Sequence, residues 1–156
     1  MLTGVCEAQQ TSYMPGYLRL HVIGASDSEE DQNAKLLVRD AILAEAANVL
    51  EGCDSAEEAC KRIEQSKDIF IMAAESACKN KVHLETGVFV FPDRQYGDMH
   101  LPSGDYLAVR VILGEGEGKN WWCVLYPGMC MPEEIEKAWK WKRVWEHWFI
   151  WRGGSV

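Results

Sequence analysis

The chain has 156 residues, the length of one domain, and its composition is 47% hydrophobic and 26% charged. This balance excludes an intrinsically disordered chain and allows a packed core without covalent cross-links. The formal net charge of −8 argues against nucleic acid as a partner, because phosphate binding needs a basic surface. No apolar run approaches the ~20 residues of a transmembrane helix. Residues 1–10 show no signal peptide, so we expect either a cytoplasmic protein or one whose natural start has been removed.

Residues 17–24 alternate between apolar and polar side chains and predict a first strand. One face would carry Leu18, Leu20 and Val22, and the other Arg19, His21 and Ile23. A helix should follow, with Ser28 and Asp31 as a capping box and Gly52 at its end. Its apolar positions follow helical spacing and are Ala34, Leu37, Val38, Ala41, Ile42, Ala46 and Val49.

A second helix is predicted from the Ser55–Glu58 capping box to about Lys79. Its inner face would carry Ala59, Ile63, Phe70 and Ala73 or Ala74. On the first helix, i, i+4 pairs are expected on a solvated face, formed by Asp31, Lys35, Arg39 and Asp40.

Three more strands are predicted at residues 81–91, 105–113 and 120–126, separated by a polar loop (92–104) and a glycine-rich turn (114–119). In the middle strand, Tyr106, Ala108 and Arg110 would share one face. The order β-α-α-β-β-β predicts an α+β fold in which two helices pack on one face of a mostly antiparallel sheet. We expect an arm (1–16), a folded domain (17–131) and a Trp-rich amphipathic tail (132–156), which would form an extra C-terminal helix.

Trp121 and Trp122 follow the glycine-rich turn, and in a strand they would point to opposite faces. One can fill the core, and the other would then lie exposed as part of a binding surface. Arg110 could be a buried ion-pair partner for an aspartate, with Asp27, Asp31 and Asp40 as candidates.

The familiar catalytic motifs are absent from the sequence. The run from Gly114 to Lys119 is not a phosphate-binding loop, because a strand follows and Asn120 stands where Ser or Thr is required; a hairpin turn is expected instead. His21, Ser26 and Asp27 lie close in sequence, but Ser26 lacks the Gly-x-Ser-x-Gly context and a helix cap explains it. No histidine pair has metal-ligand spacing on a helix. The residues alone predict an α+β recognition domain without a catalytic site, metal or cofactor.

Six cysteines are an unusual number for a domain of this size. They could form disulfides in an oxidising compartment, or be buried thiols that behave as small apolar residues. The candidates for pairing are Cys53 with Cys60 and Cys123 with Cys130, in each case seven residues apart.

The tail contains Trp139, Trp141, Trp145, Trp148 and Trp151 among lysines and arginines. This composition is typical of an interfacial membrane helix, so residues 133–152 could contact a membrane surface. A C-terminal helix docked on its own domain is an equal alternative, and the flanking glutamates weaken the membrane interpretation.

Taken together, the motifs over residues 18–131 resemble the stage II sporulation protein R family. The residues that carry the resemblance are 19–23, 26–32, 35–41, Phe91-Pro92, Tyr96-Gly97, 102–106, Arg110, 114–127 and Cys130. The chain departs from the family in three respects. The export segment that is usual at the N-terminus of the family is not found in residues 1–10, so export is inferred from the resemblance. Gly24-Ala25-Ser26 replaces an Ala-Asn-Ser sequence, and the tail lies outside the matched region.

The resemblance implies a secreted signalling protein without enzymatic activity of its own. Such proteins act in the intermembrane space between forespore and mother cell, where they activate a membrane-embedded aspartic protease that processes the pro-sigma-E factor. The residues expected to contact the partner or form the site are Trp121, Trp122, Tyr96, Tyr106, Arg110, Asn120, His21, Asp27, Asp31 and Arg39. The alternative is a small extracytoplasmic hydrolase acting on cell-wall material, with His21, Asp27 and Arg110 lining one pocket.

Overall fold

The computed structural model describes residues 12–96 and 98–127. In chain order the elements are β1 (Leu18–Ile23), α1 (Glu29–Val49), α2 (Ala56–Gln65), α3 (Lys67–Ala77), β2 (Val82–Phe91), β3 (Arg94–Tyr96), β4 (Met99–Leu101), β5 (Gly104–Leu113) and β6 (Asn120–Tyr126). The predicted arm is described only from residue 12, and the predicted tail helix lies outside the described residues. Within the described part, no helix is both long and apolar enough to cross a bilayer.

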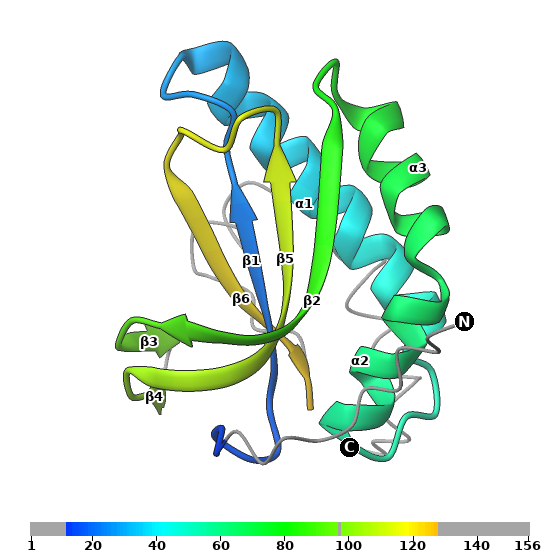
Figure 1. Cartoon of the computed structure of the whole chain (residues 1–156), viewed down its shortest axis with the longest axis vertical. Coiled ribbons are helices and arrows are strands. Elements are labelled where there is room, and N and C mark those ends of the chain that lie inside the picture. The colour runs from blue at the N-terminus through cyan, green and yellow to red at the C-terminus, as the bar shows by residue number, and fades with distance from the viewer. Residues whose placement is uncertain (1–11, 97, 128–156) are drawn as a thin grey trace, which may run out of the picture.

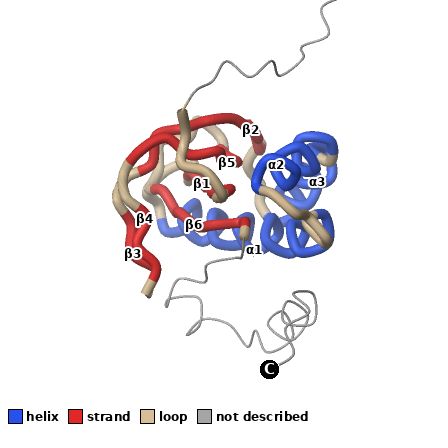
Figure 2. Tube along the Cα trace, turned by 90° about the horizontal axis from the view of Figure 1, so that it is seen from below, coloured by secondary structure: helices blue, strands red, loops and turns tan. Residues whose placement is uncertain are grey.

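The helices cover one face of a four-stranded sheet whose strand order is β2-β5-β1-β6 (Figures 1 and 2). The β2–β5 and β1–β6 pairs are antiparallel, whereas β1 and β5 run parallel. The α+β class is therefore confirmed, but the sheet is mixed. The parallel pair arises because the chain crosses over through the helices and β2 before β5 returns beside β1.

The main core lies between the sheet and the helices. The strands contribute aliphatic side chains to it, including Leu18, Leu20, Val22, Val109 and Val111, all fully buried. The helices contribute Val38, Ile42, Ala46, Ile63 and Phe70. The predicted division of β1 and β5 into two faces is thus confirmed. Leu37, one of the apolar positions at helical spacing on α1, is 55% exposed.

The second predicted helix is two helices, so the expectation of a single helix to Lys79 was wrong. At the junction, Ser66 leaves helical geometry (φ −105°, ψ 15°), and its backbone N–H donates to the carbonyls of Arg62 and Ile63. The break lets Ile63 and Phe70 both reach the main core from separate axes. The two predicted N-caps are confirmed: Ser28 Oγ accepts from the backbone N of Asp31, and Ser55 Oγ accepts from that of Glu58.

The loop predicted at residues 92–104 contains a second antiparallel ladder, β3–β4, in which Arg94 pairs with Leu101. This hairpin prolongs the β2–β5 pair and crosses the lower ends of β1 and β6 on the side away from the helices (Figure 1).

The glycine-rich turn does not close a hairpin as predicted, because β1 lies between β5 and β6. The turn instead wraps the end of β1: the N–H of Gly118 donates to the carbonyl of Gly24, and the N–H of Gly24 donates to the carbonyl of Lys119. At Gly118 an added Cβ would lie 2.4 Å from the carbonyl oxygen of Ser26. Only glycine fits this close backbone contact.

Replacing Gly118 with alanine should therefore lower the free energy of unfolding by about 2–3 kcal/mol, since the clash is with backbone that cannot rotate away. Gly52→Ala is the matched control, because Gly52 has φ +73° but nothing within 4 Å of an added Cβ. That control should lose only about 1 kcal/mol from the left-handed backbone. Urea denaturation measures both values, and equal losses in the two variants would contradict the close-contact explanation.

Candidate functional site

The sheet face away from the helices carries aromatic and basic side chains, and we call it the aromatic face. It is formed by Arg19, His21, Phe89, Phe91, Tyr106, Arg110 and Trp122 of the sheet, with Tyr96 of the β3–β4 hairpin. The strand register places Glu85, Arg110, His21 and Trp122 in one row across β2, β5, β1 and β6. Residues from four separate strands thus meet on one surface.

Trp122 stacks on His21, with ring centroids 3.8 Å apart and an interplanar angle of 16°. The edge of Phe91 meets Trp122 at 5.1 Å, and the guanidinium of Arg94 lies 5.8 Å from the Trp122 ring centroid. Trp122 remains partly exposed. Such a held, half-open tryptophan can contact a partner with little loss of side-chain entropy.

Trp121 points to the opposite face, as predicted, and packs against the main core with Arg39 5.1 Å from its ring centroid. One tryptophan therefore packs on the core and the other lies on the far face, as expected, although both are partly buried. Each indole is covered on one side by a cationic or imidazole group. Trp122 is the one that belongs to the aromatic face.

His21 lies in the middle of the face, and its Nε2 is 2.9 Å from Oδ1 of Asn120. Burial lowers the pKa of His21 and the charge of Arg110 lowers it further, while the hydrogen bond to Asn120 opposes them. The neutral imidazole is therefore favoured, which suits its stacking on Trp122.

Arg19 is fully buried beneath the hairpin, although the alternation of β1 had only placed it on the polar face. Its guanidinium carbon lies 4.2 Å from the Phe91 ring centroid and 4.5 Å from that of Tyr106. Nη2 donates to the hydroxyl of Tyr96 at 3.0 Å. Sequence reasoning missed this residue as a site candidate; the available signal was an arginine between two leucines in a strand.

Arg110 pairs with Glu85 from the neighbouring strand, with Nη2 and Nε 2.6 and 3.0 Å from Oε2. The expected pairing with Asp27, Asp31 or Asp40 was wrong, because antiparallel pairing with β2 brings Glu85 directly opposite. The hydrogen bonds from Arg110 lower the pKa of Glu85. Arg110 also lies 4.5 Å from the ring centroid of Phe89 and is partly exposed, so it remains available at the surface.

Tyr106 is fully buried and donates its hydroxyl to the carbonyl of Pro102 at 2.6 Å. Burial raises the pKa of this hydroxyl. Tyr106 therefore forms the floor of the aromatic face. Tyr96, from the hairpin, is partly exposed.

Besides Trp121, three predicted site residues lie away from the aromatic face. Asp27 accepts a hydrogen bond from the backbone N of Lys119, and Asp31 accepts one from Ser26 Oγ. Both stabilise the loops at the end of β1. Arg39 is buried on α1 and forms an ion pair with Asp40 at 2.9 Å.

The predicted solvated i, i+4 pairs on α1 were therefore wrong. Lys35 is buried like Arg39, and its Nζ donates to Gln32 Oε1 and to the carbonyl of Lys119. The reason is tertiary: the turn that wraps β1 covers this side of the helix.

Cys53 carries a partly buried thiol, and burial raises the pKa of that thiol, while its pairing with Cys60 stays a prediction. Cys123 is buried on β6, and its proposed partner Cys130 lies outside the described residues. Among the residues that the structure describes, no three His, Cys, Asp or Glu side chains are grouped to hold a metal ion.

The lowered pKa of His21 predicts a pH dependence of stability. The unfolded chain binds the proton more tightly than the folded one, so stability should fall as the pH drops below about 6.5. In urea denaturation measured at a series of pH values, the free energy of unfolding of His21→Gln should fall less at low pH than that of the wild type. By NMR, the His21 ring should titrate below its ordinary value, and lower still in Asn120→Ala. A midpoint at or above the ordinary value would contradict the assigned environment.

Comparison with known proteins identifies the family. A family model described as "Stage II sporulation protein R" matches residues 15–136. The stage II sporulation protein R of Bacillus subtilis (strain 168) is 38% identical over 119 residues, which are 72% of this chain and 53% of the relative. The chain thus spans about half the length of this curated relative. No solved structure matches. The chain belongs to the stage II sporulation protein R family.

Proposed function

We propose that this protein is a secreted sporulation signal that activates a membrane-embedded aspartic protease, which then processes the pro-sigma-E factor in the mother cell. Family membership carries the proposal, through the match over residues 15–136 and the 38% identity to the Bacillus subtilis protein. The signal would act in the intermembrane space between forespore and mother cell. Catalysis would belong to the protease, and this chain would contribute a binding surface.

The aromatic face is the surface that best supports such a role. Protein interfaces concentrate their binding energy in tryptophan, tyrosine and arginine. Here Trp122, Tyr96, Arg94 and Arg110 are all at least partly exposed on one side of the sheet. Neighbouring contacts hold Trp122 and Arg110 in place, so less conformational entropy is lost on binding.

Two other features support the proposal less directly. Residues 133–152, which lie outside the described part, would raise the local concentration near the protease if they contact the membrane. Among the described residues, the face opposite the aromatic one is covered by α1, α2 and α3 (Figure 2), whereas the aromatic face is covered in part by the β3–β4 hairpin.

The alternative, a hydrolase acting on cell-wall material, gains nothing from the geometry. Its three residues are held by different neighbours: His21 by Trp122 and Asn120, Arg110 by Glu85, and Asp27 by the backbone of Lys119.

Co-expression tests the proposal directly. The chain, secreted behind a signal sequence, should be produced in a non-sporulating bacterium together with the protease and its pro-sigma-E substrate. We expect the substrate to be cleaved only when all three proteins are present, and immunoblotting of the pro-sigma-E substrate measures this cleavage. Absence of cleavage with correctly exported chain would contradict the proposed function.

Trp122→Ala should weaken binding to the extracytoplasmic region of the protease by about 30-fold or more, the effect of losing an interface anchor. Trp121→Ala is the matched control, since it removes the same side chain from the opposite face. It should lower stability and leave the affinity of the folded protein nearly unchanged. Isothermal titration calorimetry measures the affinity of both variants. A larger loss of affinity in Trp121→Ala than in Trp122→Ala would place the interface on the helix side.

A further inference from the structure

Among the residues that the structure describes, one buried cation of the aromatic face has no anionic partner. Arg19 is fully buried, and its Nε and Nη1 have no hydrogen-bond partner among the described residues. Two carboxylates of the sheet and hairpin are paired with other residues, Glu85 with Arg110 and Asp93 with His100, whose Nε2 lies 2.7 Å from Oδ2 of Asp93. A buried charge without a partner is costly, and the rings around Arg19 offset only part of that cost.

The geometry of the guanidinium matches a carboxylate. A carboxylate can bind either of two edges, one formed by Nε with Nη2 and the other by Nη1 with Nη2. Each edge here has one unpaired nitrogen, and the shared Nη2 donates to the Tyr96 hydroxyl. The aromatic rings at 4.2 and 4.5 Å hold the plane of the group in place. The donors are thus preorganised. Nη2 has two N–H groups, one directed to each edge, and one of them donates to the neutral Tyr96 hydroxyl.

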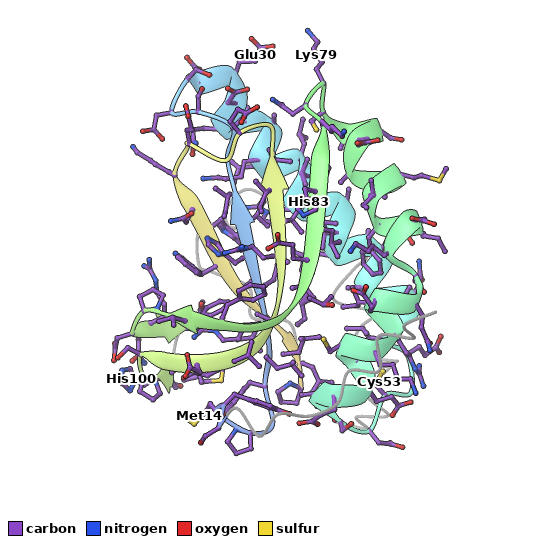
Figure 3. The ribbon with its side chains drawn as sticks, in the orientation of Figure 1. Met14, Glu30, Cys53, Lys79, His83 and His100 are labelled. Atoms are coloured by element: carbon purple, nitrogen blue, oxygen red, sulfur yellow. The ribbon has the colours of Figure 1, made fainter. Side chains whose placement is uncertain are left out.

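The β3–β4 hairpin covers this group. Tyr96, Met99 and Leu101 of the hairpin pack on the cluster around Arg19. The hairpin strands pair only with each other in the described sheets, and exposed residues 92–93 and 102–103 connect them to β2 and β5. His100, labelled in Figure 3, lies on this hairpin, which extends to one side of the sheet. Side-chain contacts, and not sheet hydrogen bonds, therefore hold the cover down.

We propose that Arg19 is the carboxylate-binding anchor of the aromatic face. An aspartate or glutamate side chain of the partner would take the place of the Tyr96 hydroxyl on the guanidinium as the hairpin moves aside. The identity of that partner rests on the function proposed above, whereas the carboxylate chemistry rests on Arg19 alone. An acidic partner segment also fits a face on which Arg94 and Arg110 flank the same cluster.

NMR of the whole chain tests the site without the protease. The Nε–H resonance of Arg19 is followed during titration with N-acetyl-glutamate methylamide. A second titration uses the neutral glutamine analogue as the matched control probe. We expect a saturable shift with the glutamate probe only. Tyr96→Phe removes the internal acceptor and should bind the probe about threefold to tenfold more tightly. An unchanged Arg19 resonance, or equal shifts with both probes, would overturn the proposal.

Arg19→Met separates binding from packing. If the guanidinium serves to bind a ligand and not to stabilise the fold, this apolar replacement should abolish the response to the probe. The midpoint temperature of thermal unfolding should stay the same or rise. A midpoint lowered by more than about 5 °C, or failure to fold, would assign Arg19 to packing and overturn the proposal. If the substrate is cleaved in the co-expression experiment but the Arg19 resonance does not shift with the glutamate probe, only the carboxylate-binding inference fails. If Arg19 binds the probe but the protease is never activated, the proposed function fails instead.

Discussion

The structure depends on β1 being hydrogen-bonded on both sides, parallel to β5 and antiparallel to β6. This placement forces the glycine-rich turn to cross the end of β1, where the backbones of Gly24 and Gly118 are in direct contact. It also puts the side chains of one short strand at the centre of both cores. Leu18, Leu20 and Val22 face the helices, while Arg19 and His21 face the aromatic cluster.

The two faces of the sheet differ in chemistry and, in our account, in role. The helix side is aliphatic and closed, and it contributes the burial that stabilises the fold. The other side is built from aromatic rings, each near an arginine or histidine, under a hairpin that belongs to no larger sheet. Such a surface suits recognition because its polar groups are positioned but only partly compensated. The unpaired nitrogens of Arg19 are the clearest example.

What could be predicted from the sequence was mainly local. Alternation assigned the faces of β1 and β5 and sent Trp121 and Trp122 to opposite sides, and the caps at Ser28 and Ser55 followed from nearest-neighbour hydrogen bonds. The wrong predictions concerned features that depend on tertiary contacts.

Neither glycine nor proline marks the break at Ser66. The burial of Lys35 depends on a turn about 80 residues later in the chain, as its hydrogen bond to Lys119 shows, and Arg39 lies against Trp121 of β6. Of the candidate site, His21, Asn120, Arg110, Tyr96, Tyr106 and Trp122 come together, while Arg19 was missed because its role depends on β3–β4 folding over it.

The central claim is that the partner binds the aromatic face and not the helices. Hydrogen–deuterium exchange of the chain with and without the extracytoplasmic region of the protease tests it most directly. Our account predicts changed exchange in β3–β4 and along β6, with the amides of α1 and α3 unaffected. Protection confined to α1, α2 or α3 would contradict it.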